Sequence, residues 1–180
     1  MPNYHRYHHP GGCYFFTVNL LQRFPNELLT QNIDILRASV KKVKTRLPFH
    51  IDAWVVLPDH MHCIWTLPKG DQNFATRWRL IKTHFVKAIP KVERRSIIRI
   101  KRGERAIWQR RYWEHFIRDD NDYQRHIDYL HYNPVKRGYV SHVCDWPHST
   151  FHRLVEQGIY HKNWGIGNVD EFDAGEFVSA

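Results

Sequence analysis

The chain has 180 residues, of which 42% are hydrophobic and 14% aromatic. This length and composition predict one folded domain and exclude a disordered or fibrous protein. No apolar run approaches the roughly 18 residues of a membrane span. The N-terminus lacks the apolar core of a secretory signal, and the three scattered cysteines do not form a disulfide framework. We therefore expect a cytoplasmic protein with no membrane association.

Charge is distributed unevenly along the chain. There are 27 Lys and Arg residues against 18 Asp and Glu, which gives a formal charge of +9. Residues 165–180 contain four carboxylates and no Lys or Arg, so residues 1–164 carry +13. A compact basic domain of this size typically binds a polyanion, although charge of this kind also serves solubility. We predict a nucleic-acid-binding domain over residues 1–164, followed by an acidic C-terminal tail over 165–180.

The hydrophobic pattern predicts alternating strands and helices. Strands are expected over residues 13–20, 49–57, 60–67 and 111–117, and helices over 26–47, 74–88 and 121–132, with a short helix opening at Trp146-Pro147. Two strand–helix units around a hairpin predict an α+β fold of the ferredoxin-like sandwich type. In this fold an antiparallel sheet carries helices on one face, and we expect the other face to be open for a ligand.

Three local features refine this prediction. In the second strand, alternation places Phe49, Ile51, Ala53 and Val55 on one face. The last long helix is expected to stop at Asn133-Pro134. Residues 89–106 contain seven Lys or Arg and two Glu, which indicates a basic insertion in the form of a mobile arm or a short hairpin.

His60 and His62 are the first chemical signal. Successive side chains of a strand alternate between faces, so His60 and His62 share one face while Met61 points to the other. Two imidazoles in this arrangement can chelate a divalent ion. The spacing alone leaves a second interpretation, which is a pair of solvated histidines in a chain that has 14 of them.

Tyr129 and Asn133 are the second signal. They lie four residues apart on a predicted helix and therefore share a face. A tyrosine near a metal can attack a phosphodiester once a base or an ion activates its phenol. An asparagine one turn later can complete the ligand shell of the metal. The alternative is an ordinary amphipathic helix, and Tyr132 is the rival nucleophile.

Four segments of the chain together match a known family. They are WVVLPDHMHCIWTLP, IWQRRYWEHFIRD, HIDYLHYNPVKRGYV and DWPHSTFHR. The chain resembles, from about Tyr4 to Trp164, the REP-associated tyrosine transposases, which are relatives of the single-tyrosine HUH transposases of small bacterial insertion sequences. HMH corresponds to the histidine–hydrophobic–histidine motif of the family, and Tyr129 falls at the position of its nucleophile. Asn133 stands where the wider superfamily often has a metal-binding glutamine.

The resemblance implies an HUH endonuclease fold with a C-terminal extension and a defined reaction. That reaction is cleavage and rejoining of single-stranded DNA at the foot of a repetitive extragenic palindrome (REP) hairpin flanked by a tetranucleotide. Mg²⁺ or Mn²⁺ held by His60, His62 and Asn133 would polarise the phosphate. Tyr129 would form a 5′-phosphotyrosine and leave a 3′-OH. The resemblance also implies a monomer that works at the bacterial nucleoid.

Basic clusters supply candidate contacts to DNA phosphates. They are Arg77, Arg79 and Lys82 in the second long helix, Arg110 and Arg111 before the last strand, and Lys136 and Arg137 after Tyr129. Tyr4 and Arg6 precede the first strand, and we expect them to reach the tetranucleotide by stacking and hydrogen bonding. For each of these residues the alternative is a solvated surface charge or an unstructured terminus.

Two other functions are compatible with the sequence. A ferredoxin-like sheet bearing aromatic residues can bind single-stranded nucleic acid without any chemistry, but His60, His62 and Tyr129 together argue against this. A replication initiator or plasmid mobilisation protein would share the HUH chemistry. The short chain without a helicase domain and the NPVKRG motif favour the transposase instead.

Overall fold

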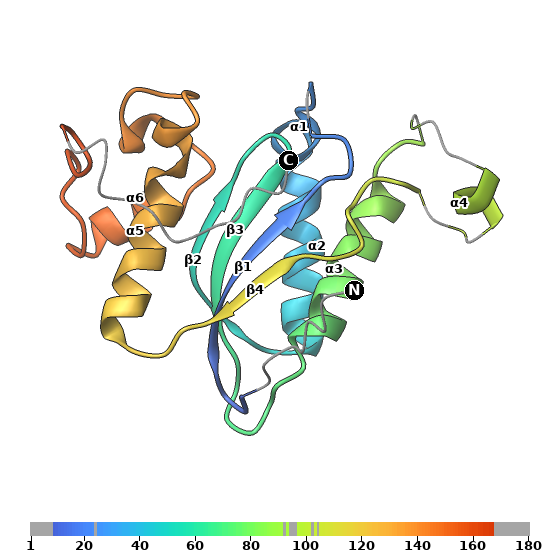
Figure 1. Ribbon diagram of the computed structural model, residues 1–180, viewed down its shortest axis with the longest axis horizontal. Helices are drawn as coiled ribbons and strands as arrows, with labels where there is room; N and C mark the ends of the chain where they lie inside the picture. Colours follow the sequence, from blue (N-terminus) through green and yellow to red (C-terminus); the bar gives the residue numbers. More distant parts are fainter. Residues whose placement is uncertain are drawn as a thin grey trace, which may run out of the picture.

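The computed structural model describes residues 9–23, 25–91, 93, 97–101, 103 and 105–167. The elements in chain order are β1 (Cys13–Asn19), α1 (Leu28–Gln31), α2 (Ile33–Arg46), β2 (His50–Val56), β3 (His60–Thr66), α3 (Phe74–Ala88), α4 (Ile97–Lys101), β4 (Trp113–Phe116), α5 (Asp120–Lys136), the 3-10 turn η1 (Val143–Asp145) and α6 (Phe151–Glu156). The strands form one antiparallel sheet in the order β2-β3-β1-β4 (Figure 1). This order confirms the predicted ferredoxin-like α+β fold. Among the described residues, no helix has the length and apolar character needed to cross a membrane.

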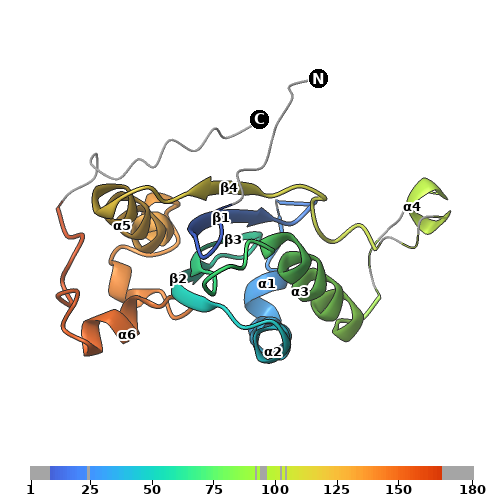
Figure 2. The same ribbon diagram turned by 90° about the horizontal axis from the view of Figure 1, so that it is seen from below.

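The sheet separates two hydrophobic layers, and helices pack against both (Figure 2). On one face α2 and α3 cover the apolar side chains of β1 and β3, where Trp65 stacks on Trp78 at a centroid distance of 4.1 Å. On the other face α5, η1 and α6 pack against Phe15 and the inner residues of β2 and β3. The expectation that this second face stays open is therefore wrong, because the apolar stripe of α5 is buried there.

A bulge in β2 changes which side chains share a face. The register against β3 shifts between Ile51 and Ala53. As a result Phe49 and Ile51 contact the α2–α3 layer, whereas Ala53 and Val55 contact the α5 layer. The prediction that all four lie on one face is wrong, because one extra residue in a strand reverses the alternation beyond it.

Two helix boundaries also differ from expectation. The helix expected over 26–47 is divided into α1 and α2 at Asn32, whose side-chain amide donates to the carbonyl of Leu28 at 2.9 Å. Helix α5 continues through Asn133 and Pro134 to Lys136. A proline in the last turn removes only one internal hydrogen bond, so the helix continues there. Asn133 consequently lies on a regular helix, one turn after Tyr129.

The basic insertion contains the short helix α4 instead of a hairpin. Arg105, near the end of the insertion, holds the residues at its start. The Arg105 guanidinium lies 2.7 Å from the carboxylate of Glu93 and donates to the carbonyl of Ile89 at 2.9 Å. Residues 92, 94–96, 102 and 104 are outside the described part of the chain, and so are residues 168–180 of the acidic tail. The final helix, α6, begins at Phe151, later than the expected Trp146-Pro147.

Candidate active site

His60 and His62 lie side by side on the face of β3 that α5 covers. Their ring centroids are 5.0 Å apart and their planes are nearly perpendicular, at 86°. The side chains are almost completely buried, with relative exposures of 2% and 0%. Met61, between them, belongs to the opposite hydrophobic layer. The alternation of the strand therefore produces the expected pair, and the alternative of two solvated histidines is excluded.

Each of these imidazoles is oriented by a hydrogen bond to Nδ1. In His60 this nitrogen lies 2.5 Å from Oδ1 of Asp59, whose other oxygen is 2.8 Å from Nε of Arg23. In His62 it lies 2.9 Å from Oγ1 of Thr17 on β1. A metal would thus be bound through Nε2 of both rings, which is the usual arrangement when a second group fixes the other nitrogen.

The charges at Asp59 and His60 suit a metal site. Burial raises the pKa of Asp59, but the hydrogen bonds with His60 and Arg23 and the positive charge of Arg23 lower it to about 2. Burial lowers the pKa of His60, and Asp59 opposes this only in part. An ionised carboxylate next to a neutral imidazole is the protonation state in which a histidine binds a metal.

Tyr129 faces this histidine pair from α5. Its ring centroid is 5.5 Å from that of His62, and the two rings meet edge to face at 72°. The ammonium of Lys136 lies 5.0 Å from the centroid of the same ring. Tyr132, the rival nucleophile, instead packs beside Trp164, with a centroid distance of 6.4 Å. The geometry therefore favours Tyr129.

Asn133 is a buried amide one helical turn after Tyr129 on α5. Its side chain is fully buried, and neither its Oδ1 nor its Nδ2 has a hydrogen-bond partner among the described residues. The Nε2 atom of His60 is buried and unpartnered in the same way. Leaving a buried polar atom unpaired costs about 1–3 kcal/mol, so such atoms point to a missing ligand. One amide oxygen and two imidazole nitrogens fit a divalent cation.

Arg77 is not available for DNA. Its side chain is 1% exposed, and its guanidinium bonds to Asp71 at 2.6 Å and to the carbonyls of Leu47 and Pro48. The two carbonyl contacts hold the start of α3 against the end of α2 and the following loop, and the contact with Asp71 ties α3 to the loop that precedes it. The structure therefore contradicts the predicted phosphate contact of Arg77. A cluster of basic residues in the sequence does not reveal which arginine turns inward, so this could not be predicted.

Three of the other basic candidates line a cavity of about 1270 Å³ between α3 and the segment before β4; they are Arg79, Lys82 and Arg110. The ammonium of Lys82 lies 5.8 Å from the ring centroid of Trp108 and 5.2 Å from that of Tyr112. This combination of cations and aromatic rings is typical of surfaces that hold single-stranded nucleic acid.

The remaining candidates lie elsewhere. Arg111, Lys136 and Arg137 are exposed, and the charge of Arg137 contributes to the lowered pKa of His60. Arg137 is therefore close enough to the histidine pair to act on it. Tyr4 and Arg6 fall within residues 1–8, outside the described part of the chain.

The residues that orient the histidines were not predicted from the sequence. Asp59 is the one with a readable signal, because a carboxylate stands directly before the first histidine of the motif. Thr17 and Arg23 come from β1 and the loop after it, so only the pairing of β1 with β3 brings them to the site.

Comparisons with known proteins assign the family. No protein-family model matches the chain. The chain is 51% identical over 178 residues to the REP-associated tyrosine transposase of Escherichia coli strain K12, which covers 99% of both chains. It is 47% identical to a putative REP-associated tyrosine transposase of Haemophilus influenzae, over 94% of this chain and 96% of that one. A solved structure of a REP-associated tyrosine transposase bound to a REP hairpin has a TM-score of 0.83 and 49% identity, with complete coverage of both chains. The chain therefore belongs to the REP-associated tyrosine transposases.

Proposed function

We propose that this transposase cleaves and rejoins single-stranded DNA at REP hairpins through a covalent bond between Tyr129 and a 5′-phosphate. One observation carries the proposal: the ring of Tyr129 lies 5.5 Å from that of His62. The neighbouring His60, and Asn133 one helical turn after Tyr129, also carry buried polar atoms that have no hydrogen-bond partner among the described residues. The 49% identical relative that was solved with a REP hairpin supports the choice of substrate.

His60, His62 and Asn133 would hold the metal ion, Mg²⁺ or Mn²⁺. Asp59 and Thr17 keep Nδ1 of the two imidazoles engaged, so that Nε2 of each ring is presented to the ion. When bound, the ion supplies Lewis acidity that polarises the scissile phosphate and stabilises the charge of the transition state.

Tyr129 provides the nucleophile. Its Oη forms a bond to the phosphorus, the bond from phosphorus to O3′ breaks, and the phenolic proton is lost while O3′ gains a proton to become a hydroxyl. The product is a 5′-phosphotyrosine and a free 3′-OH. A second 3′-OH reverses these steps and releases Tyr129, so strands are joined without ATP. Lys136, whose ammonium lies 5.0 Å from the centroid of the Tyr129 ring, would contact the phosphate.

The DNA is proposed to extend from this centre across the basic surface. Lys136 and Arg137 would contact the DNA at the cleavage point. Three further arginines and a lysine would hold the hairpin; these are Arg79, Lys82, Arg110 and Arg111, all of which except Arg111 line the cavity. Tyr4 and Arg6 are proposed to read the flanking tetranucleotide.

The catalytic domain is residues 1–164, and 165–180 is an appended tail. Because one chain supplies His60, His62, Asn133 and Tyr129, we propose an active monomer. The REP substrate would place its work on the bacterial chromosome.

The test is incubation of the protein with Mn²⁺ and a labelled REP hairpin oligonucleotide that carries its tetranucleotide. A protein–DNA adduct that survives denaturing electrophoresis is the expected result, since a phosphotyrosine is covalent. The matched substrate has the same composition with a stem that cannot pair, and it should give no adduct. Tight binding of the hairpin with no adduct would instead identify a binding module without catalytic activity.

A further inference from the structure

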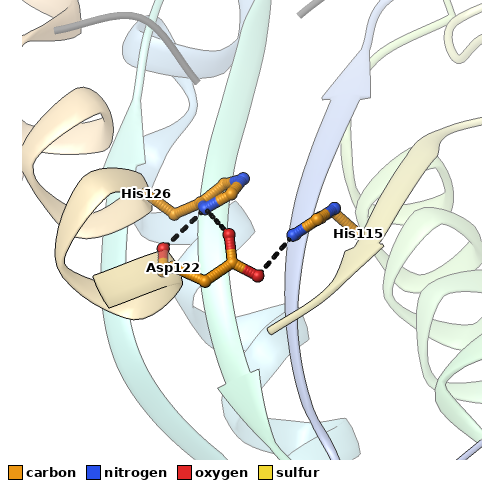
Figure 3. A group of neighbouring side chains, drawn as sticks. All are labelled: His115, Asp122 and His126. Carbon is orange, nitrogen blue, oxygen red and sulfur yellow. Dashed lines mark hydrogen bonds and ion pairs between the residues drawn. The ribbon is translucent and has the colours of Figure 1, made fainter. Parts of the chain in front are cut away.

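Two histidines and an aspartate meet where β4 faces the first turns of α5 (Figure 3). They are His115 of β4 and Asp122 and His126 of α5, and their ligand atoms all lie within 4.8 Å of one another. Nε2 of His115 is 2.8 Å from Oδ2 of Asp122, and Nδ1 of His126 is 3.2 Å from Oδ1. The two imidazoles, stacked with centroids 4.4 Å apart, thus contact different oxygens of one carboxylate.

The protonation states of this trio suit a cation. Asp122 is 1% exposed. Burial raises its pKa, but hydrogen bonds from His115 and from the backbone N–H of Arg118 lower it to about 2. Burial also lowers the pKa of His126. At neutral pH the trio therefore offers an ionised carboxylate and a neutral imidazole, the forms in which these groups bind metals.

Hydrogen bonding does not account for both nitrogens of His126. Its Nδ1 lies 2.7 Å from the carbonyl oxygen of Asp122, to which it donates. Its Nε2 is buried and has no hydrogen-bond partner among the described residues, and the side chain as a whole is 4% exposed. Burying a nitrogen that has no hydrogen-bond partner is unfavourable, and an apolar side chain in the same place would avoid that cost. A role for the imidazole beyond packing follows.

We propose that His115, Asp122 and His126 form a second metal site, for a divalent transition metal such as Zn²⁺, with water in the remaining position. Two imidazoles and one carboxylate are a common ligand set for such ions. His115 would carry its proton on Nδ1, which water can reach because the side chain is 25% exposed. Arg118 and Arg125 also contact the carboxylate, but their side chains are 66% and 65% exposed and can turn to solvent when the cation enters.

A cation here would fix the helix that carries the nucleophile. His126 precedes Tyr129 by three residues on α5, and the ring of Phe15 packs against both, at centroid distances of 5.0 and 6.2 Å. Because His115 is on β4, the ion would join the sheet to the N-terminal half of α5. The site is separate from the His60–His62 pair and does not depend on the proposed reaction.

The experiment uses the double variant His60→Ala/His62→Ala, in which the proposed catalytic metal site is absent. The tag-free, metal-stripped protein is titrated with Zn²⁺ by calorimetry and with Co²⁺ by visible absorption, which reports the coordination geometry. We expect one bound equivalent. We also expect a melting temperature that rises by several degrees when the metal is in large excess over its dissociation constant.

Two further substitutions, each added to the double variant, identify the site. Asp122→Asn and His115→Ala should each abolish the bound equivalent and the rise in melting temperature, with circular dichroism to show that the fold is kept.

The control is His142→Ala. It removes an exposed histidine that lies 3.2 Å from Asp145, a pair with no third ligand in the described part of the chain. His142→Ala should leave binding intact. Failure of the double variant to bind Zn²⁺, or binding that survives both Asp122→Asn and His115→Ala, would overturn the proposal whatever the outcome of the adduct assay.

Discussion

The ring of Tyr129 meets the imidazole of His62 edge to face, with centroids 5.5 Å apart, although the two residues belong to α5 and β3. The contact exists because α5 packs on the same face of the sheet to which His60 and His62 project. Phe15 of β1 stacks on His62 and also touches Tyr129, so it supports both. The position of the nucleophile is thus set by the docking of α5 on the sheet.

Replacement of Tyr129 by Phe should abolish covalent cleavage and leave hairpin affinity nearly unchanged. The substitution removes the attacking oxygen but keeps the ring that packs against His62. The measurement is the denaturant-stable adduct together with a binding isotherm. Tyr132→Phe is the matched control, since its ring lies beside Trp164, and it should keep full activity. Adduct formation by the Tyr129→Phe variant would show that the nucleophile is another residue.

His60→Ala and His62→Ala should each remove metal-dependent cleavage, because one imidazole holds Mg²⁺ or Mn²⁺ weakly. Asp59→Asn should raise the Mn²⁺ concentration required by about 10–100-fold, as is usual when a group that orients a metal ligand is lost. Hairpin affinity, which depends on phosphate contacts, should change little. His50→Ala is the control, since His50 is an exposed histidine paired with Asp52 on β2. Unaltered cleavage by either active-site variant at low Mn²⁺ would refute the metal pair.

The features predicted correctly from the sequence are those that depend on local periodicity. Alternation along β3 is sufficient to place His60 and His62 on one face, and the spacing of apolar residues defines α3 from Phe74 to Ala88. The features that could not be predicted depend on distant partners. The bulge in β2 exists only in its register against β3, and the hydrogen bond between Nδ1 of His62 and Oγ1 of Thr17 needs the pairing of two strands.

Arg77 and Arg79 form a matched pair for separating folding from binding. Arg77→Ala should destabilise the protein by about 2–3 kcal/mol, because a buried guanidinium that donates to Asp71 and to the carbonyls of Leu47 and Pro48 is lost. Arg79 is exposed and lines the cavity, so its loss should affect DNA binding and not stability. Arg79→Ala is expected to lower hairpin affinity without changing the melting temperature. Thermal unfolding and binding isotherms measured on both variants test this. A weakened hairpin complex with unchanged stability in Arg77→Ala would reverse the assignment.

The ion pair of Arg77 with Asp71 should also make stability depend on pH. The hydrogen bond from Arg77 holds the pKa of Asp71 below its usual value in the folded state. A carboxyl of this kind stabilises the fold above its unfolded pKa, near 3.9, and the contribution is lost as pH falls through the folded pKa. The stability difference between the unaltered protein and Asp71→Asn should therefore shrink as the pH is lowered from about 5 toward 2. A difference that stays constant over this range in denaturant titrations would exclude the linkage.

Hairpin binding should depend steeply on salt, and the residues of the cavity should account for part of that dependence. Residues 1–164 carry the excess positive charge, and each phosphate neutralised by Lys or Arg releases condensed counterions. Affinity should fall by at least ~10-fold between about 50 and about 200 mM salt. Removing a single contact, as in Arg79→Ala or Arg110→Ala, should lower the slope of log affinity against log salt by about one. Arg37→Ala is the control, since Arg37 is on α2, outside the cavity, and pairs with Asp34; its slope should match that of the unaltered protein. Equal slopes for all three variants would mean that the cavity between α3 and β4 does not hold the DNA backbone, and that the binding surface lies nearer to Lys136 and Arg137.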